Sequence, residues 1–106
     1  KNLKVKFYFI YIITYINKTV LYIGVTGDIK RRLNEHLKGE IPGFSQKYNC
    51  KYLIYYEKYE SPSHAISREK QLKKWSRTKK DLLIKERNPD LKFLNDMIFK
   101  VDDMYL

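Results

Sequence analysis

The sequence predicts an α/β fold: a small, mainly antiparallel three-stranded sheet flanked by helices. Three short runs rich in β-branched and aromatic residues read as strands, at Phe7–Tyr15, Val20–Val25 and Tyr52–Tyr59. Amphipathic segments with helix-capping residues follow the second and third runs. At 106 residues the chain is long enough to bury a core of its own. We therefore expect one domain over residues 1–106, with its core at about 7–89 and a C-terminal tail at 90–106.

The first two strands should form a hairpin around a loop at residues 16–19. The first strand is apolar on both faces, which indicates a central position in the sheet. A connection with an even number of residues makes facing positions add to an odd number, and this places Tyr11 and Tyr22 on one face. A connection with an odd number would separate them. The function considered below requires the even connection.

A helix is expected after the second strand, with Asp28 as its N-cap and Gly39 as its terminator. At about 100° per residue, one arc of this helix is mostly apolar and has Arg32 on its edge. The arc contains Ile29, Leu33, His36 and Leu37. Residues 40–49 contain proline and glycine and read as a surface loop.

A second helix should open at Ser61-Pro62 and run to about Ser76. Glu69 falls inside its apolar stripe, and a carboxylate in such a place needs a reason. The stripe contains Ala65, Ile66, Leu72 and Trp75. Thr78 and Asp81 have the spacing of a capping box, which predicts a third helix ending near residues 88–89. The tail at 92–106 has weak periodicity, and its structure is left open.

Composition points to a polyanionic partner. The 22 lysines and arginines outnumber the 12 acidic residues and give a formal charge of +10, while 15% of the residues are aromatic. That combination favours a folded domain that meets nucleic acid, although positive charge also serves solubility alone. The apolar run at 7–16 falls well short of the ~20 residues that span a bilayer, so no membrane is expected. The single Cys50 excludes an internal disulfide and favours a reducing, cytoplasmic setting.

Several side chains together could supply phosphodiester hydrolysis, which needs an activated water, a cation at the phosphate and stabilisation of the leaving oxygen. Glu69 suits one Mg²⁺ or Mn²⁺ that takes its other ligands from water and phosphate. Arg32 offers a planar donor fork for phosphate oxygens. Tyr11 or Tyr22 could accept a proton from water if neighbouring cations lowered its pKa. Taken singly, each has a plainer explanation: core aromatics, a solvated arginine, a packed His36, and a Glu69 that pairs with a lysine one turn on.

The motifs Phe9-Ile10-Tyr11 and Tyr22-Ile23-Gly24 resemble the two that name the GIY-YIG endonuclease family, with Phe9 in place of the first glycine. The resemblance covers about residues 7–89, and the closer look-alikes are small stand-alone bacterial domains similar to the incision domain of the nucleotide-excision nuclease. It implies a role in DNA repair and a catalytic set with a general base or water-orienting tyrosine, an assisting tyrosine, an arginine, a histidine and a glutamate that binds a single divalent ion. These match, in that order, Tyr11, Tyr22, Arg32, His36 and Glu69.

A dense basic segment lies beside Glu69 and reads as a track for the phosphate backbone, although such a run can also be a solvated helix face. The expected substrate-binding residues are Gly24, Lys70, Lys73, Lys74, Arg77, Lys79 and Lys80. No segment resembles a helix that reads base edges, so cleavage directed by nucleic-acid structure is favoured over cleavage directed by sequence.

The function predicted from the sequence is therefore a divalent-metal-dependent DNA endonuclease. A flap, a junction, damaged duplex and RNA all stay open as substrates. Two alternatives also stay open: a catalytically silent nucleic-acid-binding module with a nuclease fold, and a structural partner in a larger complex. Nicking that depends on metal separates the first from both alternatives, and salt-sensitive affinity for DNA separates the silent module from the structural partner.

Overall fold

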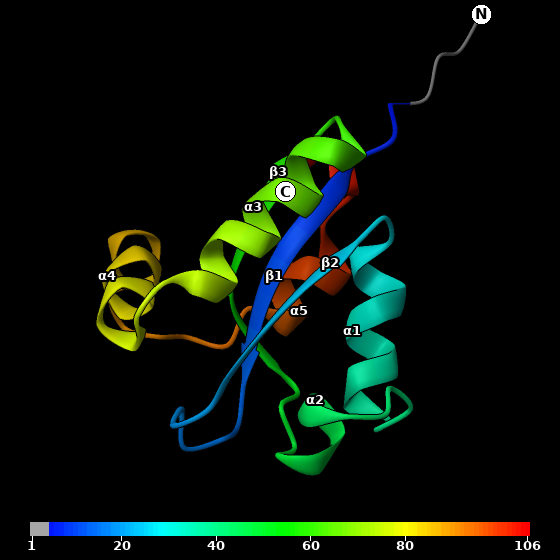
Figure 1. Cartoon of the computed structure of the whole chain (residues 1–106). Helices are drawn as coiled ribbons and strands as arrows, with labels where there is room; N and C mark the ends of the chain where they lie inside the picture. The colour runs from blue at the N-terminus through cyan, green and yellow to red at the C-terminus, as the bar shows by residue number, and fades with distance from the viewer. Residues whose placement is uncertain (1–4) are drawn as a thin grey trace, which may run out of the picture.

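The structure is a computed structural model that describes residues 5–106 (Figure 1). Its strands are β1 (Tyr8–Thr14), β2 (Leu21–Thr26) and β3 (Tyr52–Tyr59). They form a three-stranded antiparallel sheet in the order β2-β1-β3. The predicted fold class is confirmed, and so is the central position of β1, whose residues 9–14 are all buried.

The β1–β2 hairpin has the register that the site requires. Six residues, 15–20, connect the strands, and Tyr11 faces Gly24 while Ile13 faces Tyr22. Facing positions thus add to an odd number, as predicted for an even connection, although the connection is two residues longer than expected. Tyr11 and Tyr22 consequently lie on the same face of the sheet.

Helices cover both faces of the sheet (Figure 1). On the face with Tyr11 lie α1 (Ile29–Leu37) and α5 (Asn95–Lys100), and their apolar side chains join one core cluster with those of β1. The opposite face carries α3 (Pro62–Lys74) and α4 (Arg77–Arg87), which join a second cluster built on Ile10 and Ile12. The sheet therefore separates the α1 side of the molecule from the α3 side.

Capping residues set most helix ends. The Asp28 side chain accepts a hydrogen bond from the backbone N–H of Arg31, and Gly39 has a φ of 69° just past the end of α1. Ser61 is the N-cap residue of α3 and Pro62 its first residue, as predicted, but α3 ends two residues earlier than expected.

Two expectations for α3 and α4 are wrong. The N-cap of α4 is Ser76, whose hydroxyl accepts from the Lys79 N–H, so Thr78 and Asp81 do not form the capping box. Asp81 instead pairs with Arg77 one turn before it, with 2.9 Å between Nε and Oδ1. Ile66, placed on the apolar stripe of α3, is 42% exposed, because the buried face of the helix centres on Ala65 and Leu72.

The loop and the tail contain structure that the sequence did not indicate. A short helix, α2 (Phe44–Lys47), lies within the expected surface loop, and the tail contains α5 and a 3₁₀ turn, η1 (Asp103–Tyr105). Ile98 of α5 is fully buried, so the tail completes the core on the α1 side. Among residues 5–106, no helix has the length and apolar character needed to cross a membrane.

Candidate active site

Tyr11 lies directly against Gly24, its partner across the β1–β2 ladder. A Cβ atom on residue 24 would stand 2.4 Å from both Cζ and the hydroxyl oxygen of Tyr11. No real Cβ contact is that short, so a side chain here would force the Tyr11 ring to move. The glycine of the second motif is thus explained by packing: it makes room for the tyrosine of the first.

The Tyr11 hydroxyl forms a hydrogen bond with His36, with 2.9 Å between the oxygen and Nε2. His36 is on the inward arc of α1, as predicted, and is 3% exposed, while Tyr11 is fully buried. The half-buried ring of Tyr22 completes the cluster, with ring centroids 5.4 Å from His36 and 6.3 Å from Tyr11. Two strands and one helix therefore bring three ring-bearing polar side chains together.

Burial shifts both partners of this hydrogen bond toward their neutral forms. It raises the pKa of Tyr11, Tyr22 adds to the rise, and the charge of Arg32 opposes it. Burial also lowers the pKa of His36 to about 4, with Arg32 adding to the fall and Glu35 opposing it. At neutral pH the pair is a phenol and a neutral imidazole. For the Tyr11 phenol to accept a proton from water, the sequence-based hypothesis required cations to lower its pKa, and this requirement is not met.

Arg32 lies at the edge of the α1 arc and is partly exposed, as the sequence predicted. Its Nε atom is 3.1 Å from a carboxylate oxygen of Glu35. Its positive charge opposes the rise in the pKa of Tyr11 and adds to the fall in the pKa of His36. Arg32 is therefore a cation that acts on both members of this buried pair.

Glu69 projects from α3, on the other side of the sheet. Its Oε2 atom is 3.0 Å from Nζ of Lys73, and its side chain is 14% exposed. The lysine pairing raised as the plainer explanation of this carboxylate is thus present. The charge of Glu69 still contributes, as the smallest of the raising effects, to the high pKa of Tyr11. Tyr11 and Glu69 are therefore within electrostatic range of each other although they come from opposite faces.

The adjacent residue Arg68 anchors α3 to the sheet. Its Nε and Nη2 atoms donate to the two carboxylate oxygens of Glu57 at 2.9 and 3.0 Å, and Glu57 also accepts from the hydroxyls of Tyr55 and Tyr59. Burial alone would raise the pKa of Glu57, but these hydrogen bonds outweigh it and hold the pKa below its ordinary value. A fixed ion pair next to Glu69 therefore sets the position of α3 on β3.

The donor set around Glu69 restricts the metal it could hold. Within residues 5–106, no three histidine, cysteine or acidic side chains converge in a way that could bind an ion. Glu69 would be a lone protein ligand. That fits Mg²⁺, which keeps several waters and binds through one or two carboxylates plus substrate phosphates, and it does not fit a structural zinc site.

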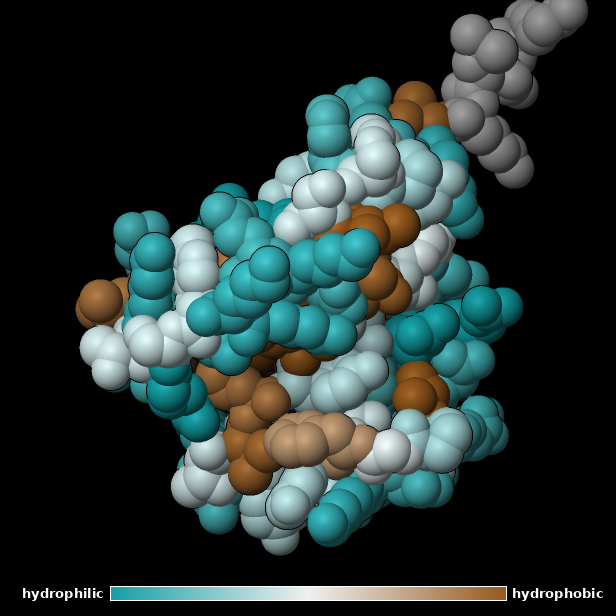
Figure 2. All heavy atoms as spheres, viewed as in Figure 1, coloured by the Kyte–Doolittle hydropathy of each residue, from teal (hydrophilic) through white to brown (hydrophobic). Residues whose placement is uncertain are grey.

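The residues of the basic segment have different surroundings. Lys73 and Lys80 line an open hollow of about 270 Å³ whose other walls are Leu21, Tyr22, Ile23 and Phe44. Figure 2 shows this face, where hydrophilic side chains over α3 and α4 border hydrophobic side chains over β2 and α2. Lys70 and Lys74 are exposed on α3.

Two members of the segment have structural contacts of their own. Arg77 donates to the backbone carbonyls of Thr19 and Lys18 in the hairpin connection, at 2.7 and 3.2 Å. The Lys79 ammonium lies 4.3 Å from the centroid of the Trp75 ring. Gly24, expected to bind substrate, is buried beneath Tyr11. These three residues have structural contacts of their own, and the cations that line the hollow are Lys73 and Lys80.

Phe44 is the residue at this hollow that the sequence analysis missed. It is 47% exposed, and it starts α2 in a stretch that was read only as a surface loop. The available signal was a pair of large aromatics, Phe44 and Tyr48, four residues apart in a segment otherwise rich in turn residues.

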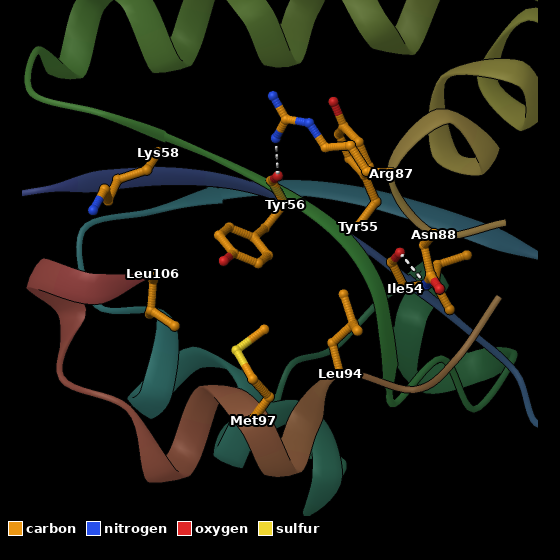
Figure 3. A pocket seen from close by; sticks show the side chains of 9 residues that line it. All are labelled: Ile54, Tyr55, Tyr56, Lys58, Arg87, Asn88, Leu94, Met97 and Leu106. Carbon is orange, nitrogen blue, oxygen red and sulfur yellow. Dashed lines mark hydrogen bonds between the residues drawn. The ribbon is translucent and has the colours of Figure 1, made fainter. Parts of the chain in front are cut away.

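A larger cavity of about 460 Å³ lies at the opposite edge of the sheet, beside β3 (Figure 3). Its walls come from β3, the end of α4, α5 and the last residue, and include Tyr56, Arg87 and Met97. None of the five catalytic candidates lines it. We place the candidate site at the β2 edge because the buried titratable pair is there.

Comparison with known proteins identifies the fold and the family. Residues 7–81 match the GIY-YIG catalytic domain. UPF0213 proteins of Staphylococcus aureus strains Mu3 and Mu50, the latter SAV0488, are each 35% identical to this chain over 80 residues, covering 76% of it and 96% of their own length. The solution NMR structure of the UPF0213 protein BH0048 from Bacillus halodurans superimposes with a TM-score of 0.53 at 24% identity, covering 79% of this chain and 88% of that one.

The aligned region contains both tyrosine motifs, α1 with Arg32 and His36, and α3 with Glu69. The solved structure shares the fold of this chain, and the matched family model is that of the GIY-YIG catalytic domain. With most of its length matched, this chain belongs to the GIY-YIG family.

Proposed function

We propose that the protein is a divalent-metal-dependent endonuclease that hydrolyses phosphodiester bonds in DNA, directed by the structure of the nucleic acid. The observation that carries the proposal is the hydrogen bond between the Tyr11 hydroxyl and His36, packed over Gly24. Family membership points to the same chemistry. Lys73 and Lys80 at the hollow supply positive charge for a polyanion, and Arg32 of α1 adds a further cation.

In this proposal the Tyr11 and His36 pair accepts the proton of the attacking water. A neutral imidazole has one unprotonated nitrogen, so Nε2 can take the hydroxyl proton of Tyr11 while the phenol oxygen takes a proton from water. The hydroxide formed attacks phosphorus, the bond to the leaving oxygen breaks, and that oxygen is protonated by solvent. Because Tyr11 is fully buried, substrate binding has to open a path to its hydroxyl, past the half-buried Tyr22.

The remaining residues act on the phosphate. Arg32 provides a planar donor fork for two phosphate oxygens. Glu69 would hold the metal, which when bound supplies Lewis-acid stabilisation of negative charge on the phosphate. If Glu69 held the metal, Lys73 would lose its ion-pair partner and would be a further cation for the DNA backbone.

Incubation of supercoiled plasmid with the protein, with and without Mg²⁺ or Mn²⁺, tests the proposal directly. We expect nicked circles only with metal. Glu69→Ala should abolish nicking and lower the free energy of unfolding by only about 0.5 kcal/mol, because its partner Lys73 is 52% exposed on the same helix. Metal-free DNA affinity should be equal or higher, since a negative charge has been removed.

Asp81→Ala is the matched control, because Asp81 also pairs with a cation one turn away on a helix, and its loss changes the net charge equally. It should keep nicking. A Glu69→Ala protein that nicks like wild type would refute the assignment of Glu69.

Two observations favour a second candidate, the catalytically silent nucleic-acid-binding module. The Tyr11 hydroxyl is buried, and Glu69 is already paired with Lys73. This alternative predicts salt-sensitive DNA binding with no nicking of DNA or RNA under any divalent metal. Absence of both nicking and DNA affinity would instead favour a structural partner.

A further inference from the structure

The hollow at the β2 edge carries an aromatic side chain that the proposed catalysis does not use. The Phe44 ring lies 6.4 Å from that of Tyr22 with 21° between their planes, and 4.7 Å from that of Tyr48. Phe44 and Tyr48 are 47% and 41% exposed. Single exposed aromatics are ordinary on protein surfaces. This pair is instead continuous with the ring cluster of the candidate site through Tyr22.

The walls of the hollow divide into two kinds of chemistry. Leu21, Ile23 and the rings of Tyr22 and Phe44 form an apolar part, and the ammonium groups of Lys73 and Lys80 form a cationic part. No acidic residue lines it. At about 270 Å³ it is slightly below the range of pockets that enclose a drug-sized molecule, so it suits one ring system of a larger ligand.

We propose that this hollow is a subsite for an unpaired nucleobase next to the scissile phosphate, with the base stacked on Phe44 and its own phosphate bound by Lys73 or Lys80. A planar aromatic wall with cations beside it is the arrangement that binds single-stranded nucleic acid, because every base has a face that can stack and every nucleotide carries a phosphate. The inference rests on the proposed nuclease function and adds to it the class of substrate.

The geometry selects against continuous duplex. Inside a duplex both faces of each base are covered by neighbouring bases, so none is free to stack on Phe44. A single strand, or a strand with an unpaired end at a flap, offers such a base without the cost of unstacking. The protein therefore prefers DNA that is unpaired at the cleavage point. Stacking tolerates any base, so the preference concerns strandedness and not sequence.

The test measures binding without metal, so that no cleavage occurs. Fluorescence anisotropy compares a short oligothymidine with a blunt duplex of the same length. Phe44→Ala should weaken single-strand binding roughly five- to hundredfold, the effect of losing one stacked base, and should change duplex binding by less than about twofold. Phe44→Trp should restore single-strand affinity, and its indole fluorescence should be quenched on binding.

Phe99→Ala is the matched control, since Phe99 is 40% exposed on α5 and so comparable in exposure to Phe44. It should leave both affinities unchanged. Phe44→Leu keeps an apolar side chain without the ring and should reproduce the single-strand loss, which guards against a folding defect in the alanine variant.

Equal weakening of single-strand and duplex binding by Phe44→Ala, or no weakening of either, would overturn the subsite. The outcome is separable from the proposed catalysis. A protein that never nicks but shows the Phe44-dependent preference would refute the nuclease and keep the subsite, and one that nicks with no such preference would do the reverse.

Discussion

The buried His36 should make the stability of this protein depend on pH in a window where few other groups titrate. Its pKa is lowered by burial from 6.5 to about 4, so below pH 6.5 the unfolded chain binds a proton that the folded protein does not. The contribution of neutral His36 to the free energy of unfolding is therefore present above pH 6.5 and is lost as the pH drops toward 4. The difference of about 2.5 between the two pKa values corresponds to about 3 kcal/mol in total, of which about 2 kcal/mol is lost by pH 5.

Thermal melts at pH 7 and pH 5 should accordingly differ by about 10 °C, on the scale of 4–8 °C per kcal/mol for domains near this size. His36→Gln removes the titrating group and should flatten the curve between these two values, although it lowers stability at pH 7. His64, exposed on α3, is the other histidine of the chain, and His64→Gln should leave the curve unchanged.

The pKa of the Glu57 carboxylate is held below its ordinary 4.5, so the stability that this group contributes is lost only below pH 4.5. The reasoning about His36 would be refuted if wild type and His36→Gln lost stability in parallel from pH 7 to pH 5. An NMR titration of the ring protons of His36 that gave a pKa near 6.5 would refute it as well.

Two substitutions test the packing that positions the site. Gly24→Ala puts a methyl group 2.4 Å from the Tyr11 ring and should lower the free energy of unfolding by about 1–3 kcal/mol in denaturant melts, whereas Gly27→Ala, whose nearest contacts are 3.3 Å away, should change it far less. Glu57→Ala leaves the Arg68 guanidinium without its carboxylate in a largely buried place and should lower the free energy of unfolding by about 3–5 kcal/mol. Glu57→Gln keeps one acceptor oxygen and should lower it less; equal losses in the two Glu57 variants would contradict this account.

Sequence reasoning was accurate where the determinants are local. Alternation and β-branched residues predicted all three strands, with β3 correct to the residue, and the caps at Asp28 and Ser61 fixed two helix starts. The parity of the hairpin connection was enough to place Tyr11 and Tyr22 on one face, even though the connection is longer than expected. The helical period of α1 correctly turned His36 inward.

Sequence reasoning did not reveal the contacts between distant segments. The basic segment looks uniform in sequence, yet Arg77 is held by carbonyls of the hairpin connection nearly sixty residues earlier. The tail lacks periodicity because α5 is short and is ordered by other means: the Asn95 side chain accepts from the N–H of Leu53 at 2.8 Å and donates to the carbonyl of Lys51. Asn88 likewise donates to the carbonyl of Ile54 at the outer edge of β3. No local sequence pattern predicts such pairings.

The hardest feature to foresee was that the candidate site is built from both sides of the sheet. Tyr11 and His36 belong to the α1 side and Glu69 to the α3 side, and the strand at that edge is β2. The Tyr11 side chain lies against β2 at Gly24, where a side chain on residue 24 would collide with it. The helix on the far side must also be held at a fixed rotation, which the Arg68 ion pair with Glu57 provides one residue before Glu69. Gly24 and Glu57 therefore both position the candidate site: Gly24 makes room for Tyr11 on one side of the sheet, and Glu57 holds the helix that carries Glu69 on the other.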